Sequence, residues 1–161
     1  MAERLSFRWS YIIAPLVVFL LSIILSAYFY HLLPAEAAVH FEVDGTPDRW
    51  LSREMTMVVV FMPQLFFVLL AGATSWGITK LDTLFRQTES ARIRPERIVL
   101  FMGNLFALPQ LILCFAMVDI FSYNSYQTHL VPMWIFLLAI LGLVTIGLGI
   151  FLVSILSKAR S

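Results

Sequence analysis

Four long apolar stretches alternate with polar segments along this chain of 161 residues. None of the four contains a charged residue, and they cover residues 10–32, 55–79, 98–118 and 130–157. Each reaches the roughly 20 residues that a helix needs to cross about 30 Å of hydrocarbon. In lipid the backbone must satisfy its own hydrogen bonds, so we expect helices. The pattern predicts an all-α integral membrane protein, with four transmembrane helices in a single transmembrane domain over residues 1–161.

The composition supports this class of protein. Hydrophobic residues make up 60% of the chain, charged residues make up 13%, and the mean hydropathy is +0.88. A soluble domain of this length needs more polar residues to cover its surface. The formal net charge of +1, without a dense basic run, argues against a nucleic-acid partner. The lipid bilayer is therefore the first partner that we expect.

The distribution of lysine and arginine predicts an orientation. Nine of the 11 basic residues lie before the first stretch, between the second and third, or after the fourth. The other two, Arg49 and Arg53, lie between the first and second stretches. Basic residues accumulate on the cytoplasmic side, so both termini should be cytoplasmic. A short polar turn over residues 122–127 should then join the third and fourth helices on the outer side.

The segment 34–54 is the most informative polar segment, and we expect it to form a structured outer lid. Apolar and polar residues alternate over 39–44, which predicts a short strand. The Asp-Gly pair at 44–45 predicts a turn. Thr-Pro-Asp at 46–48 then predicts the start of a helix, with threonine as its N-cap. The expected order is therefore strand, turn and helix.

The same segment carries a resemblance to a known family. Its residues include, in order, Pro34, His40, Phe41, Gly45, Pro47, Asp48, Trp50 and Arg53. This order, between two membrane helices, resembles the bacterial and archaeal family called domain of unknown function 1648, over roughly residues 10–80. That domain also forms the front part of membrane immunity proteins against the sporulation-delaying toxin. The resemblance implies a multi-pass protein of the prokaryotic cytoplasmic (inner) membrane.

The lid also supplies the candidate residues for binding a ligand or a partner. They are His40, Phe41, Glu42, Gly45, Pro47, Asp48, Trp50 and Arg53. We expect the glycine and proline to shape the lid, the charged residues and the histidine to make polar contacts, and the two aromatic residues to anchor it. The acidic residues could alternatively pair with Arg49 and Arg53 within the loop. A single histidine and an irregular acidic spacing predict no metal site.

Three neutral polar residues lie inside the apolar stretches: Gln64, Asn104 and Gln110. Without a charge they do not resemble a proton relay or an ion pathway. We expect them to form interhelical hydrogen bonds. Pro63 and Pro109 precede the two glutamines and could free backbone carbonyls for them.

The chain contains no known catalytic motif and no haem-binding or nucleotide-binding motif, so we expect neither an enzyme nor a cofactor. The favoured function is a small non-catalytic membrane protein that acts by binding, immunity or sensing through its outer loop. Its partner would be another membrane protein, a peptide or identical copies. One alternative is an accessory or structural subunit of a larger membrane complex. Another is an oligomeric transporter or channel, which requires the three intramembrane amides to face one water-filled cavity.

Overall fold

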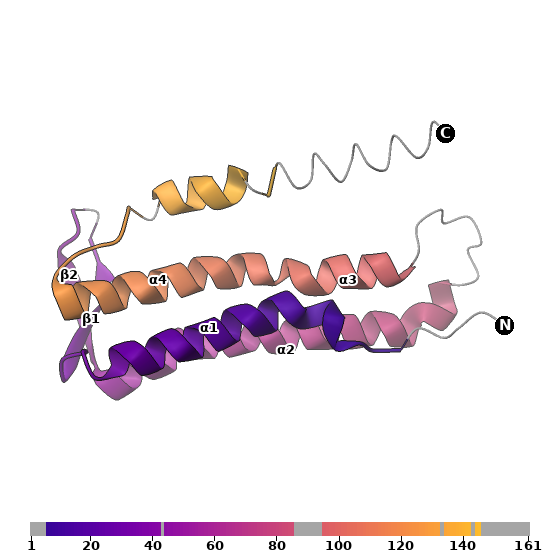
Figure 1. The fold of residues 1–161 in the computed structure, drawn as a ribbon, viewed down its shortest axis with the longest axis horizontal. Helices are drawn as coiled ribbons and strands as arrows, with labels where there is room; N and C mark the ends of the chain where they lie inside the picture. The colour runs from indigo at the N-terminus through magenta and orange to yellow at the C-terminus, as the bar shows by residue number, and fades with distance from the viewer. Residues whose placement is uncertain (1–5, 43, 86–94, 133, 143, 146–161) are drawn as a thin grey trace. The chain divides into compact units, whose positions relative to one another are not determined.

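The computed structural model describes residues 6–42, 44–85, 95–132, 134–142 and 144–145. The chain divides into two units after Thr128, and seven named elements lie in the first. In chain order these are η1 (Trp9–Ile12), α1 (Ile13–Tyr30), β1 (Glu36–Phe41), β2 (Pro47–Ser52), α2 (Arg53–Phe85), α3 (Pro95–Leu105) and α4 (Ala107–Tyr126) (Figure 1). In the second unit, residues 134–142 and 144–145 are helical.

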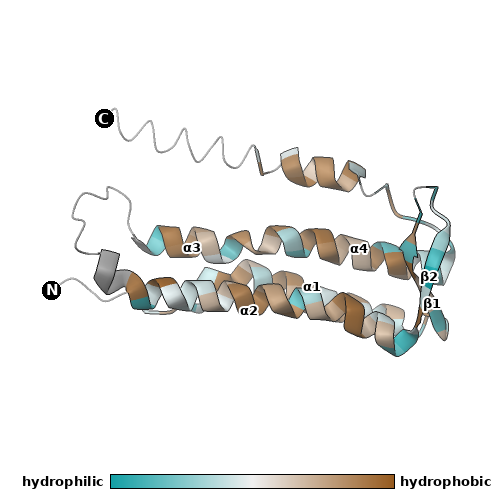
Figure 2. Ribbon diagram, turned by 180° about the vertical axis from the view of Figure 1, so that it is seen from behind, coloured by the Kyte–Doolittle hydropathy of each residue, from teal (hydrophilic) through white to brown (hydrophobic). Residues whose placement is uncertain are grey.

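Three segments of the first unit are long and apolar enough to cross a membrane: Trp9–Tyr30, Arg53–Leu81 and Glu96–Tyr126. They confirm the first three predicted helices, and the apolar colour dominates their ribbons in Figure 2. The predicted fourth span, 130–157, lies in large part outside the described residues, and a fourth crossing helix is not shown.

The third span differs from the prediction at both ends. It consists of α3 followed by α4, and α3 begins at Pro95, in the first-turn position where the missing N–H of proline interrupts no helical bond. It ends at Tyr126 rather than near residue 118, so the polar turn predicted over 122–127 is mostly the last turn of a helix. Two polar side chains of this last turn donate hydrogen bonds to nearby backbone carbonyls: Ser122 to that of Thr128 and Asn124 to that of Ile120. The helix stops at Gln127, whose φ of 55° is left-handed.

The helices α1, α2 and α4 all contact one another in this unit. Their shared core consists of Val18, Phe29, Leu33, Val60, Ala107, Cys114, Met117 and Phe121. Small polar residues complete the contact, because Ser22 and Ser26 of α1 are buried and the Ser26 hydroxyl lies 3.4 Å from the sulfur of Met117. Large apolar side chains on the other faces stay exposed, as expected for surfaces that contact lipid.

Basic residues lie over aromatic rings near both ends of the apolar part of α2. The Arg53 guanidinium is 5.4 Å from the ring centre of Tyr30, and the Lys80 ammonium is 5.7 Å from that of Trp76. Such pairs suit the boundary between hydrocarbon and water, where long basic side chains reach out of the apolar layer. The 27 residues between them correspond to about 40 Å of helix, which matches a bilayer with its headgroup regions.

Candidate binding hairpin

The segment between α1 and α2 is an antiparallel hairpin, so the helix predicted to begin at residue 46 is wrong. Glu36 lies opposite Ser52, and Phe41 lies opposite Pro47. A proline at the first residue of a strand removes no essential ladder bond, so Pro47 is compatible with β2 as well as with a helix start. Helix α2 begins only at Arg53, once the pairing has ended.

The turn of the hairpin is closed by two backbone hydrogen bonds. The Glu42 N–H donates to the Thr46 carbonyl at 2.8 Å, and the Gly45 N–H donates to the Glu42 carbonyl at 2.9 Å. Gly45 has a φ of 87°, a conformation that glycine adopts without a steric penalty. The turn predicted from the Asp-Gly pair is therefore confirmed.

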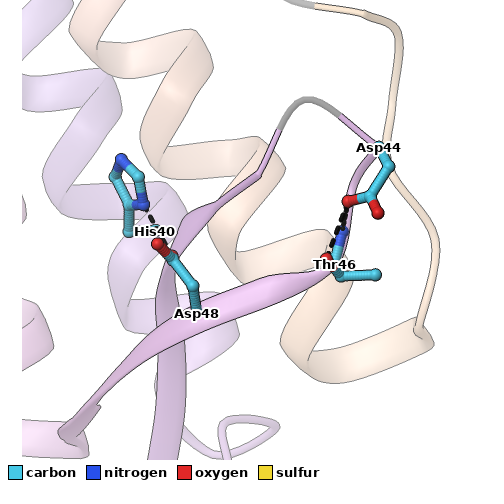
Figure 3. Close-up of polar contacts among 4 residues, drawn as sticks. All are labelled: His40, Asp44, Thr46 and Asp48. Carbon is cyan, nitrogen blue, oxygen red and sulfur yellow. Dashed lines mark hydrogen bonds and ion pairs between the residues drawn. The ribbon is translucent and has the colours of Figure 1, made fainter.

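Asp44 fixes the same turn through its side chain (Figure 3). Its carboxylate accepts a hydrogen bond from the Thr46 N–H at 2.9 Å and another from the Thr46 hydroxyl at 2.7 Å. The hydroxyl, followed by the N–H, lowers the pKa of Asp44 below its ordinary value of 3.8, because both donors favour the ionised carboxylate. Asp44 therefore shapes the hairpin tip.

The hairpin is held on the end of α4 by buried contacts. The Asn124 side chain bonds to both backbone groups of Ala38, accepting from its N–H and donating to its carbonyl, each at 2.8 Å. The ring of Phe41 packs edge-on against Tyr123, with 4.7 Å between ring centres. Ala37 and Ala38 are fully buried. These contacts join β1 to α4 although 86 residues separate Ala38 from Asn124 along the chain.

The base of the hairpin is fixed by Arg53. Its backbone N–H donates to the Ala35 carbonyl at 3.0 Å, and its Nε donates to the Pro34 carbonyl at 3.4 Å. Together with the contact to Tyr30, these bonds make Arg53 a structural residue at the entry to α2.

His40 and Asp48 form a polar pair across the two strands (Figure 3). The His40 Nδ1 lies 2.6 Å from an Asp48 carboxylate oxygen, and the two side chains are 65% and 39% exposed. An irregular register between Ala38 and Phe41 brings these residues together, since His40 itself lies opposite Arg49. Asp48 was expected in the first turn of a helix and instead lies in β2. Trp50, also in β2, is 51% exposed.

The eight residues predicted as a binding set therefore separate into two groups. The side chains of His40, Glu42, Asp48 and Trp50 are exposed on the hairpin. The remaining four, Phe41, Gly45, Pro47 and Arg53, are half-buried and shape or anchor it. The exposed group therefore offers most of the surface that a partner could contact without a rearrangement of the hairpin.

A metal site receives no support in the part of the chain that the structure describes. No group of three or more histidine, cysteine, aspartate or glutamate side chains is placed there to hold an ion. The pairing expected between acids and arginines takes another form, because Asp48 contacts His40 and Arg53 contacts backbone carbonyls.

The three intramembrane amides form the expected interhelical hydrogen bonds. Gln64 in α2 and Gln110 in α4 each donate to the backbone carbonyl of the other, at 3.4 and 3.1 Å. Asn104 accepts from the Ala14 N–H at 2.8 Å and donates to the Ser10 carbonyl at 3.1 Å. The amides thus occupy two separate contacts and do not converge on one cavity.

Asn124 is the residue that the sequence pattern missed. It was included in the predicted polar turn, where an asparagine has an ordinary local role. Its position in the last turn of an apolar helix was the available signal, because a buried carboxamide there must find backbone partners.

Membrane-length helices with a hairpin docked on one end define a membrane-embedded helical protein. Residues 17–67, which include most of α1, the hairpin and the first half of α2, match the family model described as a domain of unknown function (DUF1648). The match supports the resemblance to this family that the order of residues in the hairpin predicted. No curated protein and no solved structure matches the chain.

Proposed function

We propose that this protein is a small non-catalytic membrane protein that binds a partner through the exposed side chains of its hairpin. One observation carries the proposal: Asn124 and Tyr123 hold the hairpin on α4, while polar and aromatic side chains remain exposed on it. A surface whose backbone is already ordered loses little conformational entropy when it binds.

The charges of the hairpin favour a cationic partner segment. Glu36, Glu42, Asp44 and Asp48 are all exposed, against one exposed arginine in β2, Arg49. Trp50 adds a large, rigid apolar surface of the kind that dominates binding interfaces. A peptide or a partner protein with basic and apolar residues fits this combination, and an immunity-type role is the form of the proposal in which that partner is a toxin peptide.

The distribution of basic residues supports a matching orientation. Arg8, Lys80 and Arg97 lie near the ends of the spans opposite the hairpin. By the positive-inside rule, these ends face the cytoplasm and the hairpin faces outward. We place the protein in a prokaryotic cytoplasmic membrane with both termini cytoplasmic, so the hairpin is available to partners outside the cell membrane.

The rival functions differ in what they require. A channel needs polar side chains along one path, and the separate contacts of Asn104 and of the Gln64–Gln110 pair do not favour this. An accessory subunit would use the same hairpin, or a helix face, to contact other subunits in a fixed ratio.

Site-specific photo-cross-linking in native membranes tests the proposal. A photoreactive amino acid would replace Trp50, and the matched control would place it at Trp76, which is 57% exposed on α2 at the other end of the span. We expect a discrete protein or peptide adduct from position 50, weakened by Asp48→Asn, and lipid adducts from position 76. The same adducts from both positions, or none from position 50, would contradict the proposal. Mass determination of the complex purified in mild detergent separates the rivals, since other subunits in fixed ratio would favour the accessory-subunit function.

A further inference from the structure

The contact between Gln64 and Gln110 leaves two polar atoms without a protein partner. Both residues have an exposed fraction of 0%, and each uses its Nε2 to donate to the other's backbone carbonyl. The two carboxamide oxygens are buried and have no hydrogen-bond partner among the described residues. An acceptor left in this state inside an apolar core is unfavourable by several kcal/mol in hydrocarbon reference systems, so such oxygens normally have a donor.

Reorienting the side chains does not solve the problem. Turning either carboxamide by half a turn would place its oxygen against a backbone carbonyl oxygen and would leave its N–H groups without that acceptor. The hydrogen bonds to Gln110 and Gln64 carbonyls therefore fix which atom of each amide points away from the contact.

The surrounding side chains offer no strong donor either. This holds for the residues that the structure describes: along their own helices, the positions three and four residues away are apolar except for Cys114, whose thiol is a weak donor. The two serines of α1 that face this core already use their hydroxyls, Ser22 on the Val18 carbonyl and Ser26 on the Met117 sulfur.

The backbone of the same stretch adds to the surplus of acceptors. Pro63 and Pro109 directly precede the two glutamines and carry no N–H, so each helix loses one backbone donor at this level. The site lies deep in the apolar layer, because Gln64 is 11 residues from Arg53 and 16 from Lys80, or about 16 and 24 Å along the helix.

We propose that the Gln64–Gln110 contact is a binding site for water inside the transmembrane bundle, with water donating to both carboxamide oxygens. Water supplies two donors per molecule and is small enough for a site between packed helices. The segments of α2 and α4 that follow the two prolines would thus contact each other through bound water. Val60 and Cys114, one turn away, belong to the apolar core.

Water-edited solid-state NMR on the full chain in lipid bilayers with deuterated acyl chains tests this site. In uniformly ¹³C,¹⁵N-labelled protein, the side-chain amides of glutamine report the transfer of magnetisation from water. Gln127, which is exposed, serves as the wet reference, and the buried backbone amides of Ala71 and Met117, about two helical turns from the two glutamines, serve as the dry reference. Sequential backbone assignment identifies the two signals, and Gln64→Met and Gln110→Met each remove one of them as a check.

We expect transfer to both side chains at a rate several-fold above the dry reference and approaching that of Gln127. Transfer no faster than at Ala71 and Met117 would overturn the proposal and leave a dry amide pair. A carboxamide shift that follows the concentration of sodium or potassium, and is absent in choline chloride, would also overturn it, because the occupant would then be a cation.

Discussion

Asn124, in the last turn of α4, forms two hydrogen bonds of 2.8 Å with the backbone of Ala38 in β1. The geometry is that of a neighbouring strand: one side-chain amide satisfies the N–H and the carbonyl that point away from β2. Both residues are buried, at 8% and 0% exposed, so water cannot easily replace the bond. The position of the hairpin therefore depends in part on a side chain that lies outside the matched family segment.

The first prediction follows from this bond. Asn124→Leu keeps the branched skeleton of the side chain, with bulkier methyl groups at its end, but two buried backbone groups of Ala38 lose their partner. Such groups destabilise by about 1–3 kcal/mol, which should accelerate amide hydrogen exchange at Ala38 roughly tenfold or more. Exchange measured by mass spectrometry in detergent or nanodiscs would detect the change.

The control for this variant is Ser122→Ala, which removes a bond from the same helix end to the Thr128 carbonyl. It should leave exchange at Ala38 unchanged. Equal acceleration in both variants would mean that the helix end as a whole, rather than the Asn124 amide, positions the hairpin.

The helices were predictable because lipid leaves the backbone few alternatives. Apolar runs of this length and the absence of charge located α1 and α2 closely. The end of α4 was not predictable from hydropathy, since Ser122 and Asn124 look polar in the sequence and are buried by contacts with segments far away or beyond the helix end.

The hairpin shows why a local signal can mislead. Thr-Pro-Asp favours a helix start, but the same three residues also suit the first residues of a strand after a tight turn. Pairing with β1 decided between them, through contacts such as Phe41 opposite Pro47. The candidate residues were identified, whereas their division into exposed and anchoring groups depends on Tyr123 and Asn124, which no local pattern connects with the hairpin.

The second prediction concerns a close approach of helices at Gly103 in α3. A Cβ at this position would collide with the carbonyl oxygen of Tyr11 and the hydroxyl of Ser75, and would lie 3.1 Å from the Tyr11 carbonyl carbon. Because two of these atoms belong to backbone, the neighbour cannot yield by a rotamer change. Gly103→Ala should therefore destabilise the protein by about 1–3 kcal/mol.

Gly72→Ala is the matched control, because a Cβ on this helical glycine meets nothing within 4 Å. It should be neutral or stabilise by up to about 1 kcal/mol, as alanine favours helix. Unfolding followed by circular dichroism in detergent compares the two variants. A Gly103→Ala protein as stable as Gly72→Ala would show that α3 does not pack this closely against η1 and α2.

The third prediction is a pH dependence at the hairpin tip. The two donors of Thr46 lower the pKa of Asp44 below 3.8, so the turn is fully stabilised above that pH. As the pH falls through the lowered pKa, the carboxylate takes up a proton and the stabilisation is lost. The chemical shift of the Thr46 N–H should therefore titrate below about pH 4, with no comparable change between about pH 5 and 7.

Asp44→Asn removes the titrating group while keeping an acceptor of similar shape, and the Thr46 signal should then stay constant over the acid range. A titration that persists in this variant would assign the effect to another carboxylate of the hairpin, such as Glu42 or Asp48.

The last prediction separates stability from binding at the His40–Asp48 pair. Because both side chains are more than one third exposed, a double-mutant cycle of His40→Gln and Asp48→Asn should give a coupling of only about 0.2–1 kcal/mol for unfolding. We expect this short contact to contribute little to folding and instead to orient the exposed groups of the two side chains. The variants should therefore keep the hydrogen exchange of Ala38 and lose most of the adduct formed from position 50. The contrary outcome would be a His40→Gln protein in which Ala38 exchanges as fast as in Asn124→Leu. The His40–Asp48 pair would then help to hold the hairpin on the helices, and the surface left for a partner would consist of Glu42 and Trp50.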